Sequence, residues 1–321
     1  MWQRRLLPPL LCGLILVGYA GVTAPSWAIA RAAEDISALW NDPTDLETRD
    51  LFHGNWGASH APNPDAVYTF VRRKKGGANP GVVVRDSIGR TWHVKQAADG
   101  SRGAEGPVEV ALSRVLNAAG YHQPPVYFLP SFTMMTSDGQ VQREAGGRFR
   151  LDDPSLRELG VWSWQDNPFI GTPPFEGLLV ILLMFNSWDL KDSNNTLYDV
   201  RREGEARRWY VVRDLGGALG ETGRFRPKRN HIDKFERHIF ITNAGHDLVE
   251  FGYDGKQPQL IRHRITVDTV RWAASLMSRI DDRQWNDAFR AGGYDQALGN
   301  RFIAKIRANI AQARLRANRT Q

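Results

Sequence analysis

One polar loop, residues 186–195, holds several residues whose types could do chemistry together. Asp189, Lys191 and Asn194 stand in the pattern D-L-K-x-x-N. Because Lys191 is two residues from Asp189, both side chains can face one small volume from a single loop. A carboxylate can orient a hydroxyl or take its proton, a lysine offers a point charge to an anion, and an amide oxygen suits a hard divalent cation.

Three further residues become interesting beside this loop. Lys95 ends a predicted strand, Glu109 lies on a predicted helix, and Asp214 opens the triplet Asp-Leu-Gly after another predicted strand. Each also has a simpler interpretation: a strand-end surface lysine, a solvated first-turn helix acid and a turn aspartate. Glu105 competes with Glu109 as the partner of Lys95. Asp189 and Asn194 could likewise be turn and capping residues.

The order and spacing of these residues resemble the protein-kinase superfamily, in particular its atypical bacterial and secreted branches (HipA-like, lipid-kinase-like or secreted-kinase-like). The resemblance covers roughly residues 66–295. In that family a strand lysine contacts nucleotide phosphates and pairs with a helix glutamate, roles that fall here on Lys95 and Glu109. The catalytic aspartate falls on Asp189, and the lysine that neutralises the transferred phosphoryl group falls on Lys191.

The resemblance also implies a metal and a nucleotide. The two magnesium ligands of the family fall on Asn194 and Asp214. The implied cofactors are therefore ATP with Mg or Mn. The implied partners are a nucleotide and a hydroxyl-bearing acceptor, which could be a protein, a sugar or a lipid head group.

Several positions depart from the pattern of ordinary eukaryotic-type protein kinases. No clean G-x-G-x-x-G lies between the first two predicted strands, where Gly76, Gly77 and Gly81 only approximate it. Ser187 and Trp188 stand where that family has histidine and arginine, and no A-P-E element follows Asp-Leu-Gly. These departures fit the atypical branches better, and they leave the acceptor open.

The elements that must position these residues are predicted from periodicity. Residues 66–71, 81–85 and 91–95 are rich in Val, Tyr, Trp and Thr and are separated by glycine turns, which predicts an antiparallel meander. Pro107 favours a helix start, Gly120 favours its end, and residues 124–129 form a further strand. We expect a polar turn at residues 136–147, a short strand at 148–151 and a connection at 152–175.

The second half is predicted to be mainly helical. Residues 175–185 are apolar on all sides and predict a buried helix. A hairpin follows at 196–200 and 208–213, and a long basic loop runs from 216 to 240. The remaining predicted helices are 267–280, 282–291 and 295–317. These patterns predict the fold class α+β, with an antiparallel-sheet half (66–160), a helical half (161–321) and a peripheral lead-in (29–65). The resemblance implies that the two halves are the N-lobe and C-lobe of a bilobal protein-kinase-like fold.

The N-terminus is typical of an export signal. Arg4 and Arg5 precede an apolar stretch from Leu6 to Val22, and small residues offer cleavage after Ala28 or Ala30. The alternative is a retained anchor. In both cases we expect the folded region outside the cytoplasm, in the periplasm or secreted, with residues 1–28 as the signal peptide.

Composition excludes other classes of site. The 321 residues carry a formal charge of +7, which is too modest to indicate nucleic acid as a partner, and the only cysteine is Cys12 in the apolar segment. The eight histidines show no zinc spacing, and no G-x-S-x-G appears. Residues 300–321 are basic and amphipathic. They favour a final helix with a wet basic face over weak contact with an anionic membrane.

The function expected from the sequence is an exported kinase-like phosphotransferase that moves the γ-phosphate of ATP to a hydroxyl. One alternative is a catalytically inactive, pseudokinase-like binding or scaffold module of the cell envelope, which the irregular glycine loop and the scarcity of ATP outside the cytoplasm favour. Nucleotidyl transfer from the same cleft is a third possibility.

Overall fold

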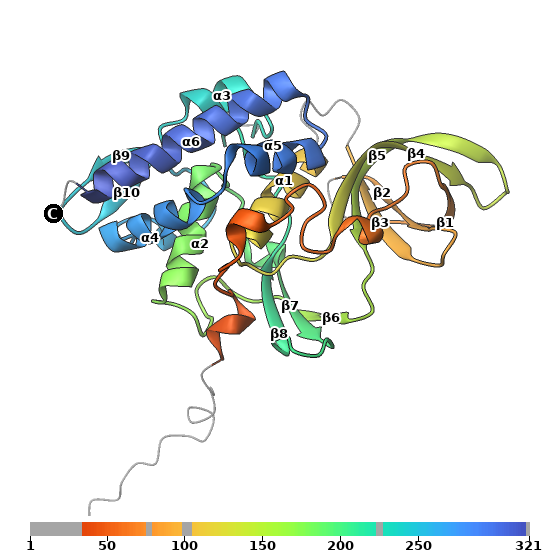
Figure 1. The fold of residues 1–321 in the computed structure, drawn as a ribbon, viewed down its shortest axis with the longest axis horizontal. Coiled ribbons are helices and arrows are strands. Elements are labelled where there is room, and N and C mark those ends of the chain that lie inside the picture. Colours follow the sequence, from red (N-terminus) through yellow and green to blue (C-terminus); the bar gives the residue numbers. More distant parts are fainter. Residues whose placement is uncertain (1–33, 75–78, 98–104, 223–226, 319–321) are drawn as a thin grey trace, which may run out of the picture. The chain divides into compact units, whose positions relative to one another are not determined.

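The computed structural model describes residues 34–74, 79–97, 105–222 and 227–318 (Figure 1). Residues 34–321 form one compact unit. The predicted export signal, residues 1–28, lies outside the described residues. Within the described ranges no helix is both long and apolar enough to cross a membrane. The fold is mixed α+β, as the alternation of strand and helix patterns predicted.

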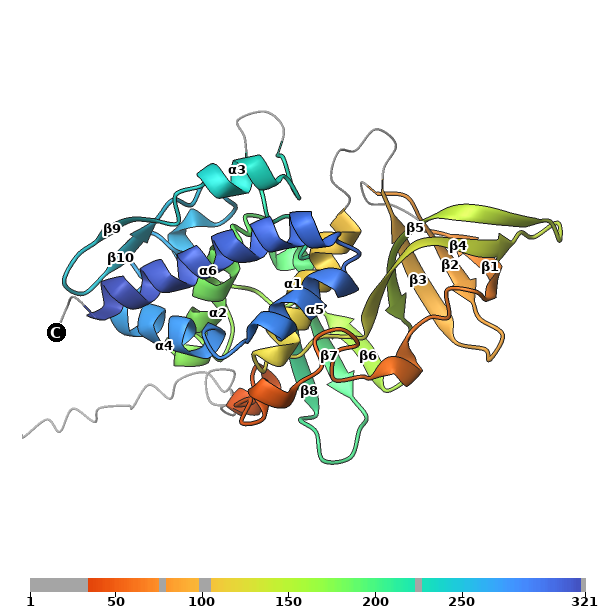
Figure 2. The same ribbon diagram turned by 45° about the horizontal axis from the view of Figure 1, so that its top comes forward.

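The strands in the first half of the sequence form a closed barrel (Figure 2). Neighbouring strands are antiparallel except for the first and fourth, which pair in parallel. The barrel's strands are β1 (Val67–Arg73), β2 (Gly81–Arg85), β3 (Thr91–Gln96), β4 (Val126–Met135) and β5 (Val141–Leu151), in the order β1-β2-β3-β5-β4. Alternate residues such as Tyr68, Val84, Trp92 and Phe149 are fully buried in the interior. The predicted meander of the first three strands is confirmed by the antiparallel pairing of β1 with β2 and of β2 with β3.

The expectation of a polar turn at 136–147 is wrong for most of that range. β5 begins at Val141 and pairs with β4 along its whole length, leaving a tight turn that ends at Gly139, whose φ is +84°. Residues 141–146 are exposed or half-buried, so this end of the β4–β5 hairpin has no buried face. Without such a face the sequence shows no apolar alternation from which a strand could be predicted.

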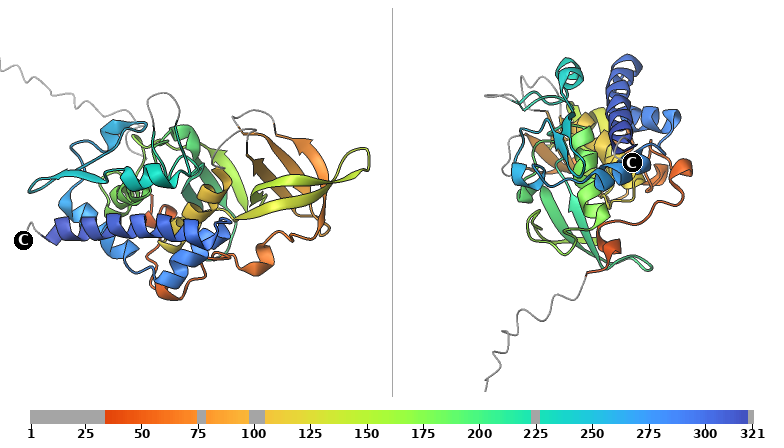
Figure 3. Two further views of the ribbon diagram at one scale, coloured as in Figure 1. Left: turned by 90° about the horizontal axis from the view of Figure 1, so that it is seen from above. Right: turned by 90° about the vertical axis from the view of Figure 1, so that its left-hand side faces the viewer.

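Helix α1 (Glu105–Ala118) follows the barrel's third strand and contacts β4, β5 and helix α5 (Asp282–Ala291). Its apolar residues join a large core built around α2 (Pro173–Met184), the buried helix that the sequence predicted. Thr172 caps α2 by accepting a hydrogen bond from Phe175 N. The other predicted helices are confirmed as α4 (Val267–Met277), α5 and α6 (Gln296–Asn318), whose packing Figure 3 shows.

The lead-in is not peripheral. Leu46 and Leu51 are buried in the large core, and the side chain of Gln284 donates hydrogen bonds to the carbonyls of Leu46 and Arg49. The segment contains a 3₁₀ turn, Ile36–Ala38. The segment is therefore part of the folded unit, because its apolar residues Leu46 and Leu51 are buried in the core.

A second sheet joins the two halves of the sequence. β7 (Asn195–Val200) and β8 (Arg208–Val212) form the predicted hairpin, and β6 (Leu156–Gly160) adds to its edge within the segment that we expected to be a connection. β6 is mostly exposed, so its sequence carries no strand pattern. The predicted long loop at 216–240 contains a short helix, α3 (Ile232–Arg237), and β9 (Ile241–Ala244) pairs with β10 (Val249–Phe251) beyond it.

The last helix uses several of its basic residues within the fold. Arg301 forms ion pairs with Asp233 and Glu236, Lys305 donates to the carbonyl of His238, and Arg307 pairs with Asp282. These contacts favour a structural role for α6, because its basic side chains form ion pairs and a hydrogen bond with neighbouring elements.

Candidate functional site

Lys95 is the centre of the first group of charged residues. It follows Val94, which faces the barrel interior, so the strand alternation turns Lys95 outward toward α1. Its Nζ lies 3.2 Å from Glu109 Oε2, 3.1 Å from Asp214 Oδ1 and 2.8 Å from Glu105 Oε2. The lysine and Glu109 are both buried, whereas half of the Asp214 side chain is exposed. The structure therefore brings Glu109 and Asp214 into direct contact with Lys95.

The charges in this group adjust one another's pKa. Desolvation opposes the charged form of Lys95, but the carboxylates of Glu109 and Asp214 outweigh it and hold the pKa of Lys95 above its ordinary value. Desolvation likewise opposes ionisation of Asp214, yet Lys95 and then Arg148 hold the pKa of Asp214 below its ordinary value. Both groups are accordingly charged at neutral pH.

Glu109 uses both oxygens of its carboxylate. Oε2 faces Lys95, and Oε1 lies 2.8 Å from Nε of Arg148, a buried residue of β5. Glu105, one turn earlier on α1, also pairs with Arg229. The two glutamates that competed as the lysine's partner both contact it, because residues i and i+4 share one face of a helix.

The second group lies on the loop after α2. Asp189 is held by the ammonium of Lys191, whose Nζ lies 2.9 Å from its Oδ1, and Asn194 Nδ2 donates to its carbonyl at 2.7 Å and to its Oδ2 at 3.2 Å. Asp192, in the same loop, accepts from Trp164 N and from the side chain of Gln257. Asp189, Lys191 and Asn194 are therefore in contact, and Asp192 anchors the loop to the body.

The segment that carries Asp214 touches both groups. The N–H of Arg213 donates to the carbonyl of Asn194 at 2.8 Å, which continues the β7–β8 ladder. A Cβ on Gly216 would lie 2.6 Å from Cβ of Glu105, and a Cβ on Gly217 would lie 3.0 Å from Cβ of Asp189. The glycines after Asp-Leu are thus required for close packing between helix α1 and the Asp189 loop.

Asp214 itself has a left-handed backbone, with φ of +52°. Aspartate tolerates this conformation better than most residues, although it still costs free energy, and such residues concentrate at functional sites. The conformation turns the chain at the end of β8 so that the carboxylate reaches Lys95.

Two oxygens near this turn suit a divalent cation. Asn194 uses its amide nitrogen as a donor, which leaves Oδ1 without a hydrogen bond in the described part of the chain, and Asp214 contacts Lys95 only through Oδ1. Among the described residues there is no group of three or more His, Cys, Asp or Glu side chains that could hold a metal. Two oxygen ligands fit Mg²⁺, which commonly takes one or two protein oxygens and completes its shell with phosphates and water.

Three of the cavities that the described residues enclose are relevant to the site. One of about 190 Å³ is lined by Lys74, Ser113, Arg148 and Asp214 among others. A second, of about 370 Å³, lies between His93, Asp152, Leu156 and Tyr198.

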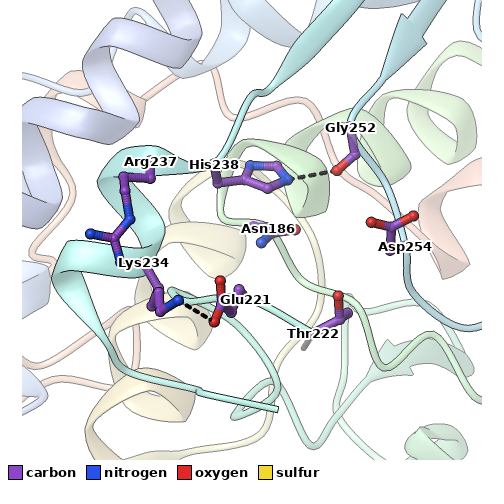
Figure 4. Close-up of a pocket in the computed structure, with 8 residues that line it drawn as sticks. All are labelled: Asn186, Glu221, Thr222, Lys234, Arg237, His238, Gly252 and Asp254. Carbon is purple, nitrogen blue, oxygen red and sulfur yellow. Dashed lines mark hydrogen bonds and ion pairs between the residues drawn. The ribbon is translucent and has the colours of Figure 1, made fainter. Parts of the chain in front are cut away.

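The third cavity, of about 520 Å³, is lined by α3 and by residues on both sides of it (Figure 4). Arg237 and Asp254 lie on opposite sides of this cavity, and Lys234 pairs with Glu221 at its edge. Asn186, three residues before Asp189, forms part of its wall. The cavity therefore adjoins the loop that carries Asp189.

Sequence reasoning missed the cations around Glu109. Arg148 was expected only as a strand residue, and Lys74 and Arg213 were given no role. The sequence did carry a signal for Arg148, because it is a charged residue within a predicted strand. A charged side chain that a strand buries needs a partner of opposite charge. The partner itself could not be identified, since Glu109 and Arg148 are joined only by the packing of α1 on β5.

Comparisons with known proteins were made for the whole chain. No family model matches it, and no curated protein matches it. Among solved structures, the crystal structure of a Helicobacter pylori proinflammatory kinase, CtkA, is similar with a TM-score of 0.48 and 11% sequence identity, covering 79% of this chain and 99% of that chain. No residue role in this chain follows from a likeness of that degree.

Proposed function

We propose that this protein is an exported, ATP-dependent phosphotransferase with a bilobal, kinase-like architecture. One observation carries the proposal: the ammonium of Lys95 contacts carboxylates from α1 and from the turn after β8, and that turn is hydrogen-bonded to the loop holding Asp189 and Asn194. Four segments far apart in the sequence thus converge with the residue types that phosphoryl transfer needs.

The reaction assigns a task to each group. The acceptor hydroxyl oxygen attacks the γ-phosphorus, the bond between that phosphorus and the β–γ bridging oxygen breaks, and ADP leaves with the electron pair. Asp189 orients the hydroxyl and takes its proton. Lys191 and Lys95 offset negative charge on the phosphates, and positioning the reactants contributes most of the remaining acceleration.

A divalent metal would be held by Asn194 Oδ1 and by Asp214. When bound, Mg²⁺ or Mn²⁺ supplies positive charge that offsets the charge of the phosphate oxygens. Lys95 keeps the carboxylate of Asp214 oriented for this task through the contact at Oδ1.

The cavity of about 370 Å³ supports a place for the nucleoside. It falls within the range of about 300–1,000 Å³ that small-molecule sites occupy. It lies at the end of β5, where His93 and Arg150 are direct cross-strand neighbours.

The cavity in Figure 4 supports a place for the acceptor. It adjoins the Asp189 loop, because Lys256 N donates to the carbonyl of Trp188 and Asp254 stands two residues before Lys256. Side chains of both signs line it, so we infer a hydrophilic acceptor such as a sugar or a polar polypeptide segment. An apolar lipid chain would find few partners there.

Transfer of the γ-phosphate tests this proposal. Purified protein lacking residues 1–28 is incubated with γ-labelled ATP, Mg²⁺ and candidate acceptors. Asp189→Ala should abolish transfer while leaving unfolding by urea unchanged within about 1 kcal/mol. Asp247→Ala, at an exposed position, is the matched control and should retain transfer. Mass spectrometry of the product separates a phosphate adduct from a nucleotide adduct. Equal transfer by Asp189→Ala and by the wild type would refute the role of Asp189.

One observation favours a second candidate, a pseudokinase-like binding module. Three carboxylates already surround Lys95, which leaves little of its charge for phosphates. Thermal unfolding discriminates the two. A nucleotide at 100 times its dissociation constant stabilises the folded state by about 2.7 kcal/mol. A rise in Tm with ATP and Mg²⁺ favours the enzyme, and no rise with any nucleotide and metal favours the scaffold.

A further inference from the structure

The peptide unit that leads into Asp189 is held from two sides. The carbonyl oxygen of Trp188 accepts from the N–H of Lys256 at 2.7 Å and from the hydroxyl of Tyr253 at 3.2 Å. On the other side, the N–H of Trp188 donates to the carbonyl of Gly217 at 3.1 Å. Because a peptide unit is planar, fixing the carbonyl of Trp188 also fixes the plane that contains the N and Cα of Asp189.

The hydroxyl of Tyr253 joins two carbonyl groups. Its oxygen lies 2.7 Å from the carbonyl oxygen of Lys256 as well as 3.2 Å from that of Trp188, so its one proton is shared between them. The Tyr253 side chain is buried. Burial, and after it the negative charge of Asp189, raise the pKa of Tyr253 above its ordinary value, so the phenol stays protonated and can donate.

Gly255 makes this close approach possible. A Cβ at this position would lie 2.3 Å from the hydroxyl oxygen of Tyr253 and 2.4 Å from the carbonyl oxygen of Trp188. Both distances are shorter than any normal contact, so only glycine lets the turn at residues 253–256 close over Trp188. The turn is therefore shaped around the carbonyl that precedes Asp189.

The same turn borders the cavity proposed for the acceptor. Gly252 and Asp254, the two chain neighbours of Tyr253, both line that cavity (Figure 4). The hydroxyl of Tyr253 is directed instead to the carbonyl of Trp188. One short segment thus contacts the acceptor cavity and the peptide that carries Asp189.

The metal-ligand end of the Asp189 loop is anchored separately. The carbonyl of Asn194 accepts from the N–H of Arg213 at 2.8 Å, and this contact does not involve Tyr253. Asp214 follows Arg213 directly. Removing the hydroxyl of Tyr253 should therefore loosen the aspartate end of the loop and leave the residues assigned to the metal in place.

We propose that Tyr253 is a positioning residue for phosphoryl transfer, which acts through the Trp188 carbonyl to hold the carboxylate of Asp189 toward the acceptor. The inference rests on the proposed function, because it gives Tyr253 a task in that reaction. A misplacement of about 1 Å can cost about a hundredfold in rate, so Tyr253→Phe should lower kcat by roughly ten- to a hundredfold. The KM for ATP should stay unchanged.

Release of the γ-phosphate from labelled ATP with Mg²⁺ measures both constants for the chain without residues 1–28. Label is counted whether it reaches dephosphorylated casein, the protein itself or water, so no particular acceptor is required. Tyr121→Phe is the matched control, because Tyr121 is also buried and its hydroxyl donates to the carbonyl of Pro174 at 2.7 Å. It should destabilise the fold to urea as much as Tyr253→Phe does and keep the wild-type kcat. Gly255→Ala should lower kcat, since its Cβ would separate Tyr253 from Trp188.

The outcomes separate this role from the proposed function. A lower kcat in Tyr253→Phe, with an unchanged KM for ATP and an active Tyr121→Phe, supports the positioning role. A wild-type kcat in Tyr253→Phe, an equal loss in Tyr121→Phe, or an effect confined to the KM for ATP overturns it and leaves the proposed function standing. If the wild type releases no more label than Asp189→Ala, the proposed function fails and the role of Tyr253 fails with it.

Discussion

Replacing Lys95 by methionine tests the geometry of the charged cluster through stability alone. The variant leaves the buried carboxylate of Glu109 with only Arg148, and leaves Glu105 and Asp214 without the shared ammonium. Breaking a buried ion pair by removing one partner costs about 3–5 kcal/mol. The Lys95–Glu109 pair meets that condition because only about a tenth of each side chain is exposed.

The same contacts predict the order of related variants. Glu109→Gln keeps Lys95 bound to Glu105 and Asp214 and leaves an amide oxygen that can accept from the buried Arg148, so its cost should be smaller than that of Lys95→Met. Asp214→Asn removes a half-exposed partner, for which solvent screening limits the loss to about 1 kcal/mol. The free energy of unfolding therefore falls most in Lys95→Met, less in Glu109→Gln and least in Asp214→Asn.

Urea unfolding monitored by tryptophan fluorescence measures these differences at pH 7. A second measurement at pH 5 tests the direction in which the stability deficit changes with pH. Without the ammonium, the carboxylates favour protonation in the folded state, so the deficit of Lys95→Met should shrink as the pH falls. A cost below about 1 kcal/mol for Lys95→Met, or an Asp214→Asn variant as unstable as Lys95→Met, would refute the placement of Lys95 among buried carboxylates.

The remaining predictions concern acid stability, the glycine turn and the alkaline limit. Burial lowers the pKa of His122 to about 4 from 6.5. Its stabilising contribution is therefore present above pH 6.5 and lost as the pH falls to 4, by about 3 kcal/mol in all. His122→Gln should remove this decrease in the free energy of unfolding between pH 6.5 and 4, as measured by urea titrations. An unchanged decrease would exclude His122 as its source. Gly217→Ala should reduce transfer because its Cβ would meet Asp189, whereas Gly245→Ala should not, because its Cβ would make only an ordinary contact with the carbonyl oxygen of Leu248 at 3.6 Å. Equal effects in the transfer assay contradict this. The raised pKa of Lys95 predicts that stability is lost above pH 10.5 as the ammonium deprotonates, and Lys95→Arg should move that loss to higher pH.

Local sequence patterns predicted the elements that carry their own periodicity. The meander, α1, α2 and the three last helices all have a buried face, and burial imposes the pattern from which they were predicted. β6 and the start of β5 were not predicted, because their residues are mostly exposed and packing against a core imposes no apolar alternation on them. α3 was not predicted, because its six residues are too few to show a helical period.

The candidate site was predictable in its residues but not in its contacts. Lys95, Asp189, Asn194 and Asp214 stand in short motifs whose spacing is visible in the sequence. The contact of Lys95 with Glu105 as well as Glu109 depends on where α1 lies on the barrel. Arg148 is joined to Glu109 by tertiary packing, which no local pattern encodes.

The central claim is that Lys95, Asp189, Asn194 and Asp214 bind the phosphates of a nucleotide together with a divalent metal. Titration calorimetry of ATP into the folded chain, with Mg²⁺ and with a chelator, measures this directly. The account predicts binding of one ATP that requires the metal and is lost in Asp214→Asn, a variant that stays folded. Absence of binding by the wild type, or equal metal-dependent binding by Asp214→Asn, would contradict it.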